Sequence, residues 1–89
     1  MEKIWVLYIL LCKDDTLYTG ITDDLDRRLA MHRAGKGAKY TRGRSPLTLV
    51  YKEECQSHSD ALKRECFVKK LKRAEKEELI KAYEKPAAE

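Results

Sequence analysis

The sequence predicts an α/β fold of the α+β type, in which a three-stranded antiparallel sheet is flanked by helices in the order β-β-α-β-α-α. Two observations carry this prediction. A strand-like apolar run over residues 4–12 is followed, after a short polar turn, by a second strand pattern over 17–21. Apolar side chains then recur at helical spacing. We expect one domain over residues 1–83, with residues 84–89 as a frayed tail.

The first apolar run is continuous rather than alternating, which is typical of a central strand covered on both faces. Asp14 and Asp15 provide turn chemistry before the second strand, which completes a hairpin. Gly20 interrupts that strand and indicates a bulge or a close approach to the backbone. Thr22 or Asp23 can cap the next helix.

That helix shows apolar spacing at Leu25 and Leu29, and Gly35 is expected to end it. Residues 35–46 read as a loop. Residues 47–55 read as a third strand that alternates loosely, with one face made of Leu47, Leu49 and Tyr51.

Two helices are expected to follow. Ser57 or Ser59 can cap the first, and a phase shift near residues 72–73 indicates a bend before the second, over 74–83. The apolar positions of the first are Ala61, Leu62, Cys66, Phe67, Val68 and Leu71.

A chain of 89 residues has room for one modest core, and its formal net charge is +4. Residues 27–44 hold seven basic side chains and no acid, which favours a nucleic-acid partner. A solvated, lysine-rich loop remains the alternative. The basic residues are Arg27, Arg28, Arg33, Lys36, Lys39, Arg42 and Arg44.

The three cysteines lack Cys-x-x-Cys spacing, so they support neither a zinc site nor a disulfide framework. They are expected to be buried free thiols in a reducing, cytoplasmic environment. The N-terminal apolar run is shorter than the roughly 18 residues of a membrane span. Acidic residues follow it at once, so neither membrane insertion nor export is expected.

Tyr8 ends the tripeptide Val-Leu-Tyr, Tyr18 begins the tripeptide Tyr-Thr-Gly, and Arg28 lies eight residues beyond Gly20. This spacing resembles the GIY-YIG nuclease domain, over about residues 5–79. The first tripeptide departs from the family letters, but both tyrosines and the glycine are kept. The loop Gly-Lys-Gly-Ala-Lys-Tyr-Thr, which begins at Gly35, is similar to that of small single-domain bacterial members. The late asparagine of the family is not located here.

The resemblance implies an endonuclease that uses one Mg²⁺ or Mn²⁺ ion while water attacks a DNA phosphodiester. Tyr8 would be the general base or orient the water, and Tyr18 would hold the water or the phosphate. A phenol is a poor base unless nearby cations lower its pKa, which the basic stretch around Arg28 is expected to do. Arg28 would grip the scissile phosphate.

Two further residues complete the implied catalytic set. His32 lies one helical turn beyond Arg28 and would assist proton transfer or contact a phosphate. Glu65, at the edge of a buried stripe, is the candidate metal ligand, because Mg²⁺ prefers oxygen and an unpaired carboxylate there costs free energy.

DNA is the expected partner, with a second protein as a source of specificity and no small-molecule substrate. Arg27 points about 100° from Arg28 around the helix and is assigned to the DNA backbone or solvent. Tyr40 would stack on a base. The other expected nucleic-acid contacts are Lys36, Lys39, Arg42 and Arg44.

Structural explanations remain open for the same residues. Tyr8 could be a core tyrosine, Arg28 could pair with Asp24, and Glu65 could pair with Lys69. The chain could then be a non-catalytic nucleic-acid-binding module, or an interaction domain that uses its C-terminal helices.

The hairpin register provides a test of the shared site. An even-numbered loop would place Tyr8 opposite Ile21 and Tyr18 opposite Leu11, and so would put the two tyrosines on opposite faces. We therefore predict an odd-numbered loop or a bulge.

Overall fold

The predicted element order is confirmed in a computed structural model that describes residues 4–37, 41, 43–44 and 46–84. The three strands form one antiparallel sheet in the order β2-β1-β3, so the continuous apolar run is the central strand as predicted. The elements are β1 (Trp5–Leu11), β2 (Leu17–Thr22), α1 (Leu25–Arg33), β3 (Thr48–Cys55), α2 (His58–Lys69) and α3 (Arg73–Glu84).

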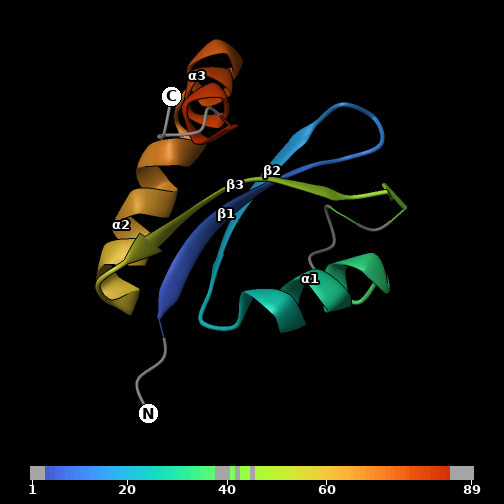
Figure 1. Ribbon diagram of the computed structural model, residues 1–89, viewed down its shortest axis with the longest axis horizontal. Helices are drawn as coiled ribbons and strands as arrows, with labels where there is room; N and C mark the ends of the chain where they lie inside the picture. Colours follow the sequence, from blue (N-terminus) through green and yellow to red (C-terminus); the bar gives the residue numbers. More distant parts are fainter. Residues whose placement is uncertain (1–3, 38–40, 42, 45, 85–89) are drawn as a thin grey trace.

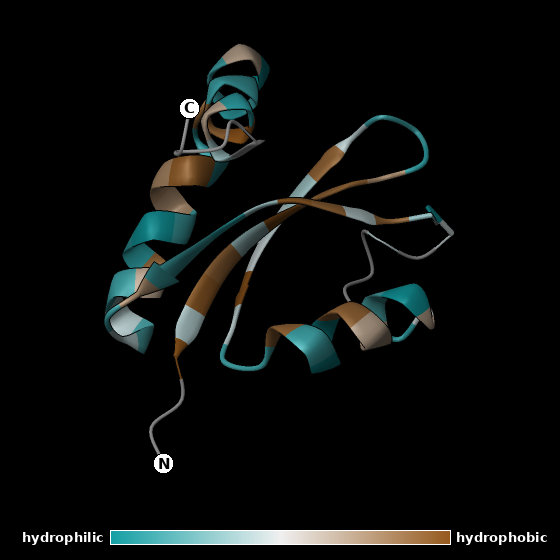
Figure 2. Ribbon diagram, in the orientation of Figure 1, coloured by the Kyte–Doolittle hydropathy of each residue, from teal (hydrophilic) through white to brown (hydrophobic). Residues whose placement is uncertain are grey.

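Helices cover both faces of the sheet, with α1 on one side and α2 and α3 on the other (Figure 1). Each face has its own apolar cluster, because successive β1 side chains point to opposite sides. Tyr8, Leu10 and Leu29 belong to the α1 side, whereas Leu7 and Ile9 pack with the α2 and α3 side. Figure 2 shows hydrophobic residues concentrated along the crossing strands, whereas hydrophilic and hydrophobic segments alternate along the helices.

The hairpin between β1 and β2 has the irregularity that a shared tyrosine site requires. Tyr8 pairs with Gly20 and Leu10 pairs with Tyr18, which leaves a five-residue loop over 12–16. Asp15 takes a φ of 68° in this loop, and its N–H donates to the Cys12 carbonyl at 2.9 Å. The loop is therefore odd-numbered, and Tyr8 and Tyr18 share one face of the sheet.

The predicted alternation of the third strand is wrong at its middle. Ile9 pairs with Tyr51, whereas Leu10 pairs with Leu49, so Val50 is an extra residue in β3. The bulge changes the face on which the following side chains lie. Leu49 therefore packs on the α1 side, and Tyr51 packs on the α2 and α3 side.

Two helix boundaries show where local signals were sufficient. Ser57 caps α2, and Gly35 follows the end of α1 with a φ of 77°, both among the predicted choices. The cap of α1 was predicted wrongly: it is Asp24, whose side chain accepts from the Arg27 N–H at 3.2 Å. The Thr22 hydroxyl accepts instead from the Asp24 N–H, at 3.1 Å.

The predicted buried stripe of α2 is correct only in part. Ala61 and Val68 are fully buried, but Leu62, Cys66 and Phe67 are exposed. The reason is that only one side of α2 packs on the sheet, and it packs beside β2 and β1. Of the three free cysteines, Cys12 alone is buried, so the prediction of three buried thiols is wrong. Within the described part of the chain, no helix is long and apolar enough to cross a membrane.

Candidate active site

Tyr8 and Tyr18 lie next to each other on the face that α1 covers. Their ring centroids are 6.3 Å apart, with an angle of 49° between the planes. Tyr8 is fully buried on the central strand, and Tyr18 is part-buried on the edge strand β2. The spacing of the two tyrosines in the sequence therefore brings two phenols to one place.

Gly20 makes the space for this pair. A Cβ atom at this position would lie 2.7 Å from the Tyr8 hydroxyl oxygen and 3.1 Å from Cε2 of Tyr18. Real Cβ atoms essentially never come as close as 2.7 Å. The interruption of the strand by glycine is thus explained by the close approach of the two rings to the β2 backbone.

His32 projects from α1 onto the same face and is fully buried. Its Nε2 atom lies 2.9 Å from the Tyr8 hydroxyl, and its Nδ1 atom lies 2.9 Å from Oγ1 of Thr41. The imidazole meets the tyrosine rings edge-on, at centroid distances of 5.9 Å for Tyr8 and 5.4 Å for Tyr18. Both nitrogens of the ring are therefore held by hydroxyl groups.

Arg28 lies one helical turn before His32 and faces the same phenols. A hydrogen bond from its guanidinium to Tyr8 is the main cause of a raised Arg28 pKa, and Tyr18 adds to it. Asp24, the expected alternative partner of Arg28, instead caps the helix. Arg28 is thus directed at the tyrosine pair.

Burial raises the pKa of Tyr8 to about 12, although the hydrogen bond from Arg28 acts in the opposite direction. Arg28 therefore lowers the pKa of Tyr8 as expected, but burial has the larger effect and the net shift is upward. Burial also lowers the pKa of His32, with the charge of Arg28 adding to the effect. Near pH 7 the site consequently holds a protonated phenol beside a neutral imidazole.

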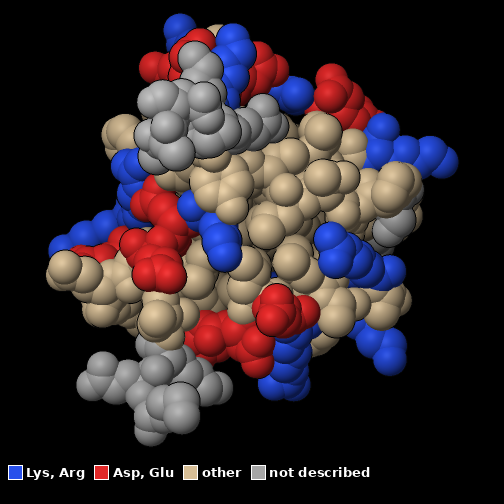
Figure 3. Space-filling model, in the orientation of Figure 1, with Lys and Arg blue, Asp and Glu red and all other residues tan. Residues whose placement is uncertain are grey.

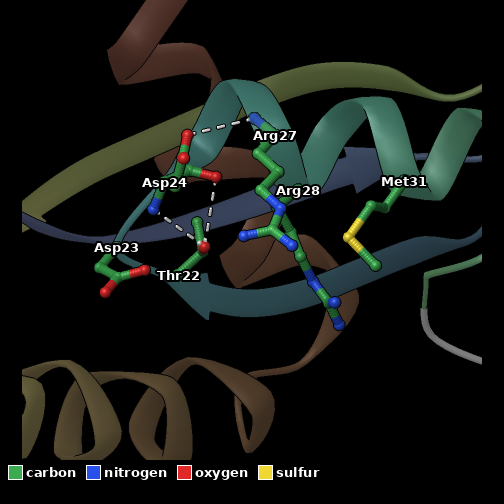
Figure 4. A pocket seen from close by; sticks show the side chains of 6 residues that line it. All are labelled: Thr22, Asp23, Asp24, Arg27, Arg28 and Met31. Carbon is green, nitrogen blue, oxygen red and sulfur yellow. Dashed lines mark hydrogen bonds between the residues drawn. The ribbon is translucent and has the colours of Figure 1, made fainter.

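A cavity of about 270 Å³ opens beside the guanidinium groups, between the end of β2 and the first turns of α1 (Figure 4). Arg27 and Arg28 both line it, together with Thr22, Asp23, Asp24 and Met31. Their 100° separation around the helix does not keep the two arginine side chains apart, because both are long and flexible.

Glu65 comes from α2, the helix that covers the other face of the sheet. Its side chain is 20% exposed and forms an ion pair with Lys69 at 3.2 Å, so the alternative partner suggested by the sequence is present. After burial and the charge of Tyr18, the Glu65 carboxylate also raises the pKa of Tyr8. The charge of Glu65 is thus the smallest of these influences on Tyr8, and it acts from the helix on the other face of the sheet.

Comparison with known proteins assigns the chain to a family. The profile of the GIY-YIG catalytic domain matches residues 4–78. The chain belongs to the GIY-YIG family. A UPF0213 protein of Natronomonas pharaonis is 54% identical over 74 residues, which cover 83% of this chain and 87% of the relative. A UPF0213 protein of Oceanobacillus iheyensis is 46% identical over 84 residues, which cover 94% of this chain and 98% of the relative.

Two solution NMR structures have the same GIY-YIG-type fold. The UPF0213 protein from Bacillus halodurans is 47% identical with a TM-score of 0.61, covering 93% of this chain and 88% of that chain. A protein from E. faecalis is 40% identical with a TM-score of 0.66, and the match covers 92% of this chain and 88% of that chain.

Metal binding in this GIY-YIG chain would depend on few protein ligands. Among the residues that the structure describes, no group of three or more His, Cys, Asp or Glu side chains could hold a metal ion. Mg²⁺, however, often uses one or two carboxylates and completes its shell with water and substrate phosphate. The part-buried Glu65 fits that arrangement, with Lys69, which is 54% exposed, as its partner in the free protein.

The basic stretch is only partly described. Lys36 is exposed, whereas Arg44 forms an ion pair with Asp14 of the hairpin loop, so its charge is already partnered. The predicted contacts of Lys39, Tyr40 and Arg42 lie outside the described residues. On the face shown in Figure 3, Lys and Arg side chains lie all around the rim with acidic side chains among them, and the centre is mostly uncharged.

Sequence reasoning missed two residues of the site. Thr41 is 1% exposed and holds Nδ1 of His32, and the backbone of Gly37 lies against the same ring. The sequence places both in the loop that is expected to track the DNA backbone. The one signal in the sequence was their membership of the loop that resembles the family.

Proposed function

We propose that this GIY-YIG protein is a metal-dependent endonuclease that hydrolyses DNA phosphodiester bonds. The observation that carries the proposal is the buried Tyr8 hydroxyl, which lies between the guanidinium of Arg28 and Nε2 of His32 at 2.9 Å. A structural tyrosine needs one hydrogen-bond partner, whereas this one is influenced by both His32 and Arg28, and Arg28 also lines the cavity.

The arrangement supports a direct route for the proton. A DNA phosphate would enter the cavity and be held by Arg28, whose planar fork suits two phosphate oxygens. As water attacks phosphorus, the Tyr8 oxygen takes the water proton and passes its own proton to Nε2 of His32. The P–O bond to the leaving sugar breaks, and that oxygen takes a proton from solvent. Tyr18 orients the water or the phosphate.

Glu65 is the residue that would hold the Mg²⁺ or Mn²⁺ ion. When bound, the ion would stabilise negative charge on the phosphate and on the departing oxygen. Lys69 would then lose its ion pair with Glu65 and become available to the DNA backbone.

Binding of the DNA would rest on phosphate contacts from Arg27 and Lys36, which carry no sequence information. We therefore expect low intrinsic sequence specificity, or specificity supplied by a partner protein. A role in DNA repair or recombination, in the cytoplasm, is consistent with such an activity.

A non-catalytic nucleic-acid-binding module is the second candidate. The observation in its favour is that Glu65 is already paired with Lys69, so its carboxylate is satisfied without a metal ion. In that case the arginines of the cavity would hold a phosphate that is never cleaved.

Nicking of a supercoiled plasmid with Mg²⁺ or Mn²⁺ separates the two candidates. If the protein is an endonuclease, the wild type nicks the plasmid only when the metal ion is present. Arg28→Ala and Glu65→Ala then lose this activity, and the control variant Lys81→Ala on α3 keeps it. DNA that remains intact despite tight, salt-sensitive binding would overturn the enzyme and support the binding module.

A further inference from the structure

Thr41 has an environment that is unusual for a loop residue. It lies between α1 and β3, outside the six main elements, yet only 1% of its surface is exposed. Its hydroxyl oxygen lies 2.9 Å from Nδ1 of His32. A buried hydroxyl and a buried imidazole each need a partner, and here they satisfy one another.

Gly37 closes the same edge of the imidazole. A Cβ atom on Gly37 would lie 2.8 Å from Cγ and 2.9 Å from Cε1 of His32, and nearer still to Nδ1. The backbone of this segment therefore packs directly on the ring. Nδ1 is enclosed by protein, whereas Nε2 is turned toward Tyr8.

These contacts decide which nitrogen carries the proton of a neutral imidazole. The Tyr8 phenol is fully buried and protonated near neutral pH, so its O–H needs an acceptor inside the protein. The acceptor that the structure places beside the Tyr8 proton is Nε2 of His32. Nε2 must then be unprotonated, so the single N–H of the ring is at Nδ1 and donates to Thr41.

We propose that Thr41 is a positioning residue that holds His32 as the Nδ1–H tautomer, leaving Nε2 free to accept the proton of Tyr8. The catalytic meaning of this tautomer rests on the proposed endonuclease function, but the tautomer itself does not.

The tautomer can be measured without any substrate. Protonated and unprotonated imidazole nitrogens differ widely in ¹⁵N chemical shift, and the chain has only two histidines. His58→Gln assigns the His32 signals. At pH 7.5 the wild type and Thr41→Ser are expected to show a protonated Nδ1 and an unprotonated Nε2. Thr41→Val, which keeps the shape but lacks the hydroxyl, is expected to shift population toward the Nε2–H form.

The nicking rate provides a second readout. The nicking rate of Thr41→Val is expected to be about tenfold lower than that of the wild type, as for one lost hydrogen bond. Thr41→Ser is expected to nick at the wild-type rate. A protonated Nε2 in the wild type, or a Thr41→Val protein with unchanged shifts, would overturn the proposal. If Thr41→Val does not fold, the wild-type and Thr41→Ser spectra still decide. If the wild type cleaves no DNA, the proposed endonuclease function is wrong, and the ¹⁵N spectra still test the tautomer independently.

Discussion

The hydroxyl of Tyr8 is held between two groups of opposite character. The guanidinium of Arg28 can only donate to it, and the neutral imidazole of His32 can accept from it. Burial raises the pKa of Tyr8 to about 12, so a free phenolate is not available near neutral pH. The general-base role that we propose for Tyr8 therefore requires an acceptor for its proton, and Nε2 of His32 lies 2.9 Å from the hydroxyl.

His32 should make stability depend on pH. Its folded-state pKa is lowered by burial, so the unfolded chain binds a proton first as the pH falls below about 6.5. The contribution of His32 to the free energy of unfolding is thus fully present above that pH, and it is lost as the pH falls through the lowered pKa. Chemical unfolding at pH 7.5 and 5.5 should show a smaller loss of stability in His32→Gln than in the wild type. An equal loss in both proteins would contradict the assignment.

Gly20 should tolerate no side chain while Tyr8 keeps its hydroxyl. Gly20→Ala is expected to cost about 1–3 kcal/mol in the free energy of unfolding, because the new methyl group overlaps the Tyr8 ring and hydroxyl. The same substitution in a Tyr8→Phe background should cost less, because part of the overlap is removed. A double-mutant cycle by urea unfolding measures the difference, and strict additivity would show that the overlap is not the cause.

At the scale of the elements, the hairpin loop sets the face on which Tyr18 lies. Asp15 has a φ of 68°, a conformation that side chains rarely adopt and glycine adopts readily. Asp15→Gly should therefore be about 1 kcal/mol more stable than Asp15→Ala. Both variants lack the carboxylate, so the exposed interaction with Arg73 cancels in the comparison. Urea unfolding of the pair is the measurement, and an Ala variant as stable as the Gly variant would contradict this account of the loop.

The elements could be predicted because their patterns are local. The continuous run of β1, Gly35 at the end of α1 and Ser57 at the start of α2 each act within a few residues. The failures depend on tertiary packing. The β3 bulge at Val50 follows from pairing with β1, and the exposure of Phe67 follows from which side of α2 meets the sheet.

The candidate site divides in the same way. The family resemblance placed Tyr8, Tyr18, Arg28 and His32 in one site, and it required the odd-numbered hairpin loop that the structure has. Thr41 could not be placed there, because it is nine residues from His32 and belongs to no periodic element, so only the folded loop reveals their contact.

At the scale of the whole molecule, a net charge of +4 favours association with nucleic acid, and its distribution determines where. Lys36 is exposed on the segment after α1, so Lys36→Gln should weaken DNA binding for all sequences alike and reduce the log–log salt slope by about one. Lys81→Gln on α3 is the matched control, with the same change of net charge. Fluorescence titrations over a range of salt concentrations test this, and equal effects of the two variants would show that the position of the charge is unimportant.

Single-turnover nicking by Tyr8→Phe tests the central claim most directly, because only one oxygen atom is removed. Tyr51→Phe is the control: it removes the hydroxyl of a part-buried tyrosine that packs on the other face of the sheet. With saturating DNA and Mg²⁺ or Mn²⁺, we predict that Tyr8→Phe loses at least about 100-fold in rate while binding DNA normally, and that Tyr51→Phe stays near the wild type. A Tyr8→Phe protein that nicks as fast as the wild type would contradict the account.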